Sequence, residues 1–217
     1  RNLKGSGLPV KIPAIEMVEI GAGGGSIASV DALGRVAVGP ESAGSQPGPA
    51  CYNQGGERAA VTDADLVLGK IDPAAFAGGS VQLAPEKASE ALQRTIGQPF
   101  GMDAPLAAFA VSEIVDENMA NAARVHAVEW GKDIAARAMI AFGGAAPLHA
   151  ARLAEKLNLS QVIVPAGAGV GSAVGFLRAP ISYEVVRSRY MRLDGFDAAL
   201  ANDLLATMHA EATAIVR

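Results

Sequence analysis

Cysteine is nearly absent from this 217-residue chain, in which Cys51 stands alone. A single cysteine excludes an internal disulfide and fits a reducing compartment, so we expect a cytoplasmic protein. Aromatic residues are also scarce, at 5% of the chain. The hydrophobic core must therefore be built mainly from Ala, Val, Leu and Ile.

Excess charge and long apolar runs are lacking as well. The formal net charge of −4 gives no electrostatic reason to bind nucleic acid or an anionic membrane. The longest uncharged stretch, residues 162–177, is interrupted by Pro165 and several glycines. It reads as strand, loop and helix, so we expect neither a nucleic-acid partner nor a membrane span.

Glycine, proline and hydrophobic residues are plentiful instead. Hydrophobic residues make up 50% of the chain, which also has 25 Gly and 12 Pro, so a sizeable core with many tight turns is available. From residue 138 onward, strand and helix patterns alternate, which predicts an α/β fold. The expected strands are 138–142, 161–164 and 180–193, and the expected helices are 147–157, 169–177 and 196–217.

The first part of the chain has shorter elements around one long loop. Strands are expected at 16–20, 27–30 and 35–38, and helices at 85–96, at 104–130 and after a cap at Thr62 or Asp63. The loop over residues 39–60 is rich in Gly and Pro, and long loops in compact domains are usually functional or disordered. Its apolar and rigid residues favour function. Because Arg1 is not an initiator Met and the last helix lacks a C-cap, we expect a segment of a longer protein.

Two glycine clusters follow apolar runs and predict a nucleotide site built from separate segments. The first comprises Gly23, Gly24, Gly25 and Ser26, whose backbone N–H groups suit a phosphate. The second is the run from Gly143 through Gly144 and Ala145 to Pro147, just before a helix. Glycine lets a ligand approach the backbone closely, and a helix N-terminus favours an anion. The structural alternatives are a hairpin or bulge at the first cluster and an ordinary tight turn at the second.

Few side chains qualify for metal binding or acid–base chemistry. The candidates are Cys51, Asp63, Asp65, His126 and His149, and zinc or manganese accepts such mixed ligands. We take Asp65 and His149 as catalytic candidates, and Cys51, Asp65 and His149 as metal ligands. In the competing interpretation Cys51 is a core residue, Asp63 a helix cap and His126 a satisfied, half-buried histidine.

The order of several short motifs resembles the hydantoinase A/5-oxoprolinase family, which includes subunits of ATP-dependent acetone and acetophenone carboxylases. The resemblance covers roughly residues 8–190. The motifs that carry it lie at residues 20–28, 39–44, 47–52, 61–69, 117–120 and 142–150.

The resemblance implies part of an actin-like ATPase fold, which is ribonuclease H-like with a mixed sheet and flanking helices, over residues 1–195. The helix at 196–217 lies outside it. ATP and Mg are the implied cofactors, with the adenosine against Gly143, Gly144 and Ala145. Glu117 and Asn118 would lie beside the cleft and contact the ribose. The residues alone favour a solvated helix face for Asp116, Glu117 and Asn118.

The implied activity is ATP-dependent ring opening of a hydantoin- or 5-oxoproline-type cyclic amide, with a hydantoinase B-type partner subunit. The Asp-x-Gly-Gly-Thr phosphate loops of the family do not occur in this sequence, so the chain resembles the C-terminal part of the ATPase core. Two alternatives stay open, a subunit of an ATP-dependent ketone carboxylase and a non-catalytic scaffold piece. The residues do not distinguish the substrate, the metal or the subunit number.

Overall fold

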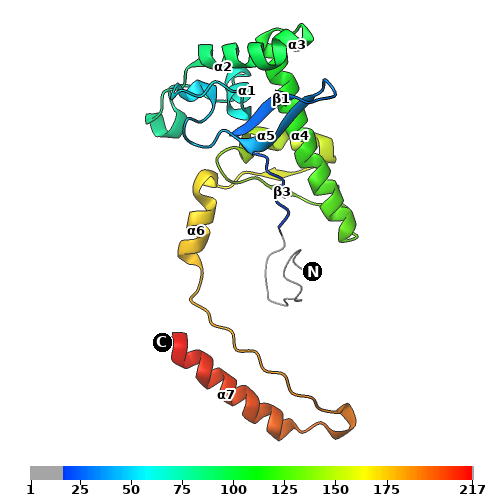
Figure 1. Ribbon diagram of the computed structural model, residues 1–217. Helices are drawn as coiled ribbons and strands as arrows, with labels where there is room; N and C mark the ends of the chain where they lie inside the picture. Colours follow the sequence, from blue (N-terminus) through cyan, green and yellow to red (C-terminus); the bar gives the residue numbers. More distant parts are fainter. Residues whose placement is uncertain (1–16, 217) are drawn as a thin grey trace. The chain divides into compact units, whose positions relative to one another are not determined.

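The computed structural model describes residues 17–216 (Figure 1). The chain divides into two compact units, Arg1–Gly171 and Ser172–Arg217. The first unit mixes helices with two small sheets, whereas the second contains helices and extended chain. The extent of the ATPase segment over residues 1–195 stays a prediction.

A β-hairpin opens the first unit. Strand β1 (Ser26–Val30) pairs antiparallel with β2 (Val36–Ser42), which confirms the strands expected at 27–30 and 35–38. The turn is held by Asp31, whose side chain accepts hydrogen bonds from the backbone N–H groups of Leu33 and Arg35. The strand expected at 16–20 is wrong over its described part, because residues 17–20 are exposed and pair with no strand among residues 17–216.

Helices pack around the hairpin and enclose the main core. They are α1 (Val61–Val67), η2 (Phe76–Gly79), α2 (Pro85–Leu92), the π-helical turn η3 (Gln93–Gly97), α3 (Gln98–Phe100) and α4 (Ala104–Glu129). Buried Ala64 on α1 and Ala107 and Ala108 on α4 leave room for the helices to approach closely. In Figure 1, α1, α2 and α3 gather near the start of α4, whose C-terminal end projects away from them.

The carboxylate of Asp63 organises the loop between the hairpin and α1. It is fully buried and accepts hydrogen bonds from the backbone N–H groups of Cys51 (2.7 Å), Ala60 (2.8 Å) and Ala50 (3.2 Å). The short helix η1 (Ala50–Tyr52) is thereby fastened to the start of α1. The cap predicted at Thr62 or Asp63 is corrected to Ala60, because α1 begins at Val61 and Asp63 reaches back from its third residue.

A parallel β-α-β unit completes the first part of the chain. Strand β3 (Met139–Ile140) pairs with β4 (Val162–Ile163), and helix α5 (Ala146–Leu157) connects them. These elements confirm the alternation expected from residue 138, although the strands are shorter than predicted. Helix α5 packs on α4, and a short helix, η4 (Ala168–Val170), follows β4.

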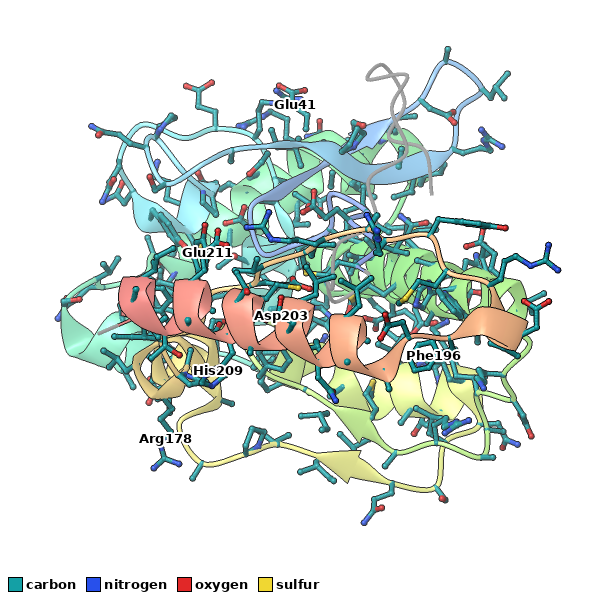
Figure 2. All side chains as sticks on the ribbon, turned by 90° about the horizontal axis from the view of Figure 1, so that it is seen from below. Glu41, Arg178, Phe196, Asp203, His209 and Glu211 are labelled. Carbon is teal, nitrogen blue, oxygen red and sulfur yellow. The ribbon has the colours of Figure 1, made fainter. Side chains whose placement is uncertain are left out.

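The second unit contains the last helices. Helix α6 (Gly171–Arg178) begins at its boundary, and η5 (Leu193–Gly195) precedes α7 (Ala198–Val216). The strand expected at 180–193 is wrong, because this segment pairs with no strand among residues 17–216. Figure 2 shows Phe196 just before α7, and Asp203, His209 and Glu211 spread along it. Across residues 17–216, no helix combines the length and the apolar character that crossing a membrane requires.

Replacement of Asp63 by Ala should destabilise the first unit strongly. Three backbone N–H groups would lose their acceptor in a buried place, and each such loss costs about 1–3 kcal/mol. We expect the free energy of unfolding in urea to fall by roughly 3 kcal/mol or more. Asp72→Ala is the control, because its carboxylate accepts one exposed hydrogen bond, from the backbone N–H of Ala74. Equal losses in the two variants would contradict the assignment.

Candidate functional site

A chain of buried polar side chains joins α1, α4 and α5. The ring of His149 on α5 lies between two carboxylates, with Nδ1 2.8 Å from Oδ1 of Asp116 and Nε2 3.1 Å from Oδ2 of Asp65. The exposed fractions of these residues are 3%, 1% and 1%, respectively. Two sequence-predicted residues, Asp65 and His149, therefore meet in one cluster.

The cluster continues through Asp65 to a lysine that follows α1. Nζ of Lys70 lies 3.0 Å from Oδ1 of Asp65 and donates a hydrogen bond of 2.8 Å to Oγ of Ser112 on α4. Ser112 is buried as well. Each carboxylate thus faces a cationic or hydrogen-bonding partner, as buried charges require.

The two carboxylates decide the charge of His149. Burial lowers the pKa of the imidazole, but the hydrogen bonds with Asp116 and Asp65 outweigh burial and raise the pKa to about 9. The ring is therefore an imidazolium at neutral pH, with both N–H groups donated to carboxylates. In this state His149 has no lone pair for a metal and no free nitrogen that could take a proton from a substrate. The geometry shows that Asp65 and His149 pair with each other in the core, and a catalytic role for either residue stays a prediction.

The predicted metal-ligand set of Cys51, Asp65 and His149 is not assembled. Among residues 17–216, no group of three His, Cys, Asp or Glu side chains is arranged to hold a metal ion. Cys51 packs in an apolar cluster with Leu66, and burial together with the nearby Asp63 carboxylate raises the pKa of its thiol. The thiol therefore packs as a small apolar side chain and is not activated as a nucleophile.

The glycine turn before α5 is open to solvent. A Cβ atom built on Gly143 or Gly144 would meet no other atom within 4 Å. Gly143 has a φ of +99° and donates a backbone hydrogen bond to the carbonyl of Ala168. Glycine is needed at 143 for its backbone angle, whereas the free space beside 144 leaves room for a ligand.

In the first glycine cluster, two glycines lie so close to other side chains of the protein that a larger residue would clash with them. A Cβ atom on Gly24 would lie 2.6 Å from Oγ1 of Thr62, and one on Gly25 would lie 2.7 Å from Oγ of Ser42. Oγ of Ser26 accepts a hydrogen bond from the N–H of Gly23 and donates one to the carbonyl of Gly21. Packing against α1 and β2 therefore explains two of these glycines, and phosphate contact at 23–26 stays a prediction.

Glu117 and Asn118 face different surroundings. The carboxylate of Glu117 forms ion pairs with Arg124 and with Lys156 of α5. Asn118 is exposed and lines a shallow groove beside β2. Both side chains thus contribute to the surfaces of α4, and their contact with a ribose remains a prediction.

Sequence reasoning missed three members of the buried cluster, namely Lys70, Ser112 and Asp116. Asp116 was expected on a solvated helix face, which is wrong because it is 1% exposed. The available clue was its helical spacing from Ser112 and Ala120, which places these residues on one side of α4, and all three are buried. His126 is half-buried as predicted, but it is not satisfied, because its buried Nδ1 has no partner among the described residues.

The sequence matches the hydantoinase/oxoprolinase family over residues 2–185. The chain belongs to this family. The match includes the loop fastened by Asp63, the buried cluster around His149 and the open turn at Gly143 and Gly144.

The named relatives are subunits of two kinds of enzyme, a caprolactamase and a carboxylase. Caprolactamase subunit alpha of Pseudomonas jessenii is 39% identical over 85% of this chain and 27% of its own length. The solved structure of the ATP-dependent caprolactamase matches 89% of this chain and 28% of its own, with a TM-score of 0.68 and 34% identity. The acetophenone carboxylase gamma subunit of Aromatoleum aromaticum is 42% identical over 84% of this chain and 25% of its own length.

A solved structure of acetone carboxylase, free of nucleotide, also resembles this fold. It matches with a TM-score of 0.76 and 30% identity over 90% of this chain and 28% of that chain. This chain therefore spans less than a third of the length of the relatives that it matches.

The charge of His149 should make the first unit lose stability at alkaline pH. Its folded pKa of about 9 exceeds the ordinary value of 6.5, so the stabilisation is complete below pH 6.5 and disappears as the pH rises through 9. We expect the free energy of unfolding to fall by roughly 3 kcal/mol across this range, and His149→Gln to lack this component of the fall. Denaturant unfolding at a series of pH values measures it.

The exposed His209 on α7 supplies the matched control. The variant His209→Gln should keep the alkaline fall of the unmodified chain. A fall of the same size in His149→Gln would show that other groups cause it.

Proposed function

We propose that this chain supplies one segment of an actin-like ATPase core in an enzyme that uses ATP to open cyclic amides. Family membership and the likeness to the ATP-dependent caprolactamase support this function. The observation that carries the proposal is the open space beside Gly143 and Gly144 at the start of α5.

The residues at this turn fit a nucleotide. Gly144 leaves room for a flat base or a sugar directly before α5, where the positive end of the helix dipole favours a negatively charged group. When bound, ATP would supply the phosphoryl group that activates an amide oxygen. The chain's own contribution is to bind and orient the nucleotide through Gly143, Gly144 and Ala145.

In this proposal the buried cluster supports the nucleotide site indirectly, by holding the glycine turn and the start of α5 in place. His149 lies one turn inside α5, and its bonds with Asp65 and Asp116 fix the start of this helix against α1 and α4. Asp65 and His149 are therefore positioning residues in this proposal. The donor set does not fit zinc or manganese, because His149 is cationic and Cys51 is buried elsewhere, so no step is assigned to these metals.

A ketone carboxylase is the second candidate activity. The 42% identity with the acetophenone carboxylase gamma subunit favours it, as does the TM-score of 0.76 with acetone carboxylase. Because both named relatives are subunits, we propose a partner subunit of the hydantoinase B type for either activity. A cyclic amide or a ketone would then be the small-molecule substrate.

Calorimetry with Mg-ATP and ADP tests the nucleotide proposal. The samples are this chain alone and a fusion in which it replaces the matching segment of caprolactamase subunit alpha. We expect binding in the fusion, because the family's upstream phosphate loops are restored there. A folded fusion that binds neither nucleotide would overturn the ATPase function and leave a scaffold role. ATP turnover that depends on a cyclic amide, rather than on a ketone with bicarbonate, separates the two activities.

Gly144→Val should block nucleotide binding without unfolding the chain. The added side chain enters free space and meets no protein atom within 4 Å of its Cβ, so it occupies the volume that the ligand needs. We expect affinity for ATP in the fusion to fall at least about tenfold, with an unchanged unfolding midpoint. Gly175→Val is the matched control, because Gly175 also has open space and lies on α6. Unchanged affinity in Gly144→Val would place the nucleotide elsewhere.

A further inference from the structure

The C-terminal end of α4 and the loop that follows it form a hollow, which we call the α4-end pocket. Its volume is about 390 Å³, large enough for a small organic molecule. The pocket lies at the start of β3, whereas the glycine turn follows the end of that strand. The lining residues are Ala123, His126, Ala127, Trp130, Lys132, Ile134 and Arg137.

The walls of the α4-end pocket are apolar and include an available aromatic ring. Ala123, Ala127 and Ile134 contribute aliphatic surface. Trp130 is 55% exposed, although a tryptophan is usually well buried, and its ring meets that of His126 edge-on at 6.4 Å. An exposed indole beside aliphatic side chains favours a ligand with a flat or apolar body.

The charged side chains that line the pocket are both cationic. Across residues 17–216, neither Lys132 nor Arg137 forms a side-chain ion pair or hydrogen bond, although their backbone groups cap the adjacent turns. The nearby Asp133 carboxylate is occupied by the backbone N–H of Ala135. Near the end of α4, the carbonyls of His126, Ala127 and Val128 accept backbone hydrogen bonds. The pocket lining therefore offers positive charge from two side chains.

His126 contributes an imidazole ring to the lining of the pocket. Its Nδ1 is buried and has no hydrogen-bond partner among the described residues. An N–H on the other ring nitrogen, Nε2, would be a hydrogen-bond donor on the opposite edge of the imidazole. Such a donor complements an anionic oxygen.

We propose that the α4-end pocket binds a small aromatic carboxylate. The carboxylate pairs with Lys132 and Arg137, and the ring packs against Trp130 and the aliphatic wall. This site is separate from the proposed nucleotide turn, and its occupancy does not depend on ATP.

Trp130 is the only tryptophan of the chain, so its fluorescence reports directly on this pocket. The test titrates the 217-residue chain with benzoate and with benzamide, its neutral analogue of the same shape. We expect a saturable fluorescence change with benzoate and at least about tenfold weaker binding of benzamide, because the cations recognise the charge. No saturable change up to roughly 10 mM benzoate, or equal affinity for benzamide, would overturn the proposal.

Charge removal tests the same contacts from the protein side. The double variant Lys132→Gln/Arg137→Gln should weaken benzoate at least about tenfold, whereas Lys87→Gln/Arg94→Gln, which removes two cations of α2 and η3, should leave the affinity unchanged. Unaltered affinity in the first variant, or equal weakening in both, would overturn the proposal. Circular dichroism of each variant establishes that the fold is retained.

Discussion

The charged ring of His149 between Asp116 and Asp65 is the interaction on which the first unit depends. It ties α5 to α4 and α1 with side chains that are almost fully buried. Removing one member would leave an uncompensated charge in the core, which costs several kcal/mol. The two carboxylates and the imidazolium balance one another's charge. Lys70 places a second cation beside Asp65 and also donates a hydrogen bond to Ser112. The start of α5 is therefore held in one position.

That fixed position matters because the open glycine turn leads directly into α5. A ligand that uses the free space beside Gly144 needs a backbone that does not move away from it. The Asp63 carboxylate has a parallel effect on the other side of α1, where it fixes the 50–60 loop. Two buried aspartates of α1, Asp63 and Asp65, thus hold two different segments. This arrangement accounts for the aspartate pair within a helix of seven residues better than a metal site does.

Local patterns predicted the elements that local forces determine. Alternating apolar residues and turn residues located the hairpin, and helical periodicity located α4 and α5. Strands were misplaced at 17–20 and 180–193, because a strand requires a partner and apolar composition does not specify one. The site was harder still. His149 and Asp65 could be chosen by residue type. Asp116 and Asp65 precede His149 by 33 and 84 residues in the sequence, however, and no local pattern pairs them with it. Only the packed structure shows that Asp116 turns inward and that two carboxylates meet the ring of His149.

The most direct measurement is the titration of the His149 imidazole by NMR in the intact chain. The account predicts an imidazolium that persists through neutral pH and titrates at a pKa of about 9, because Asp116 and Asp65 accept both of its N–H groups. A ring that loses its proton at or below the ordinary value of 6.5 would contradict the buried charge, and with it the positioning role assigned to the cluster.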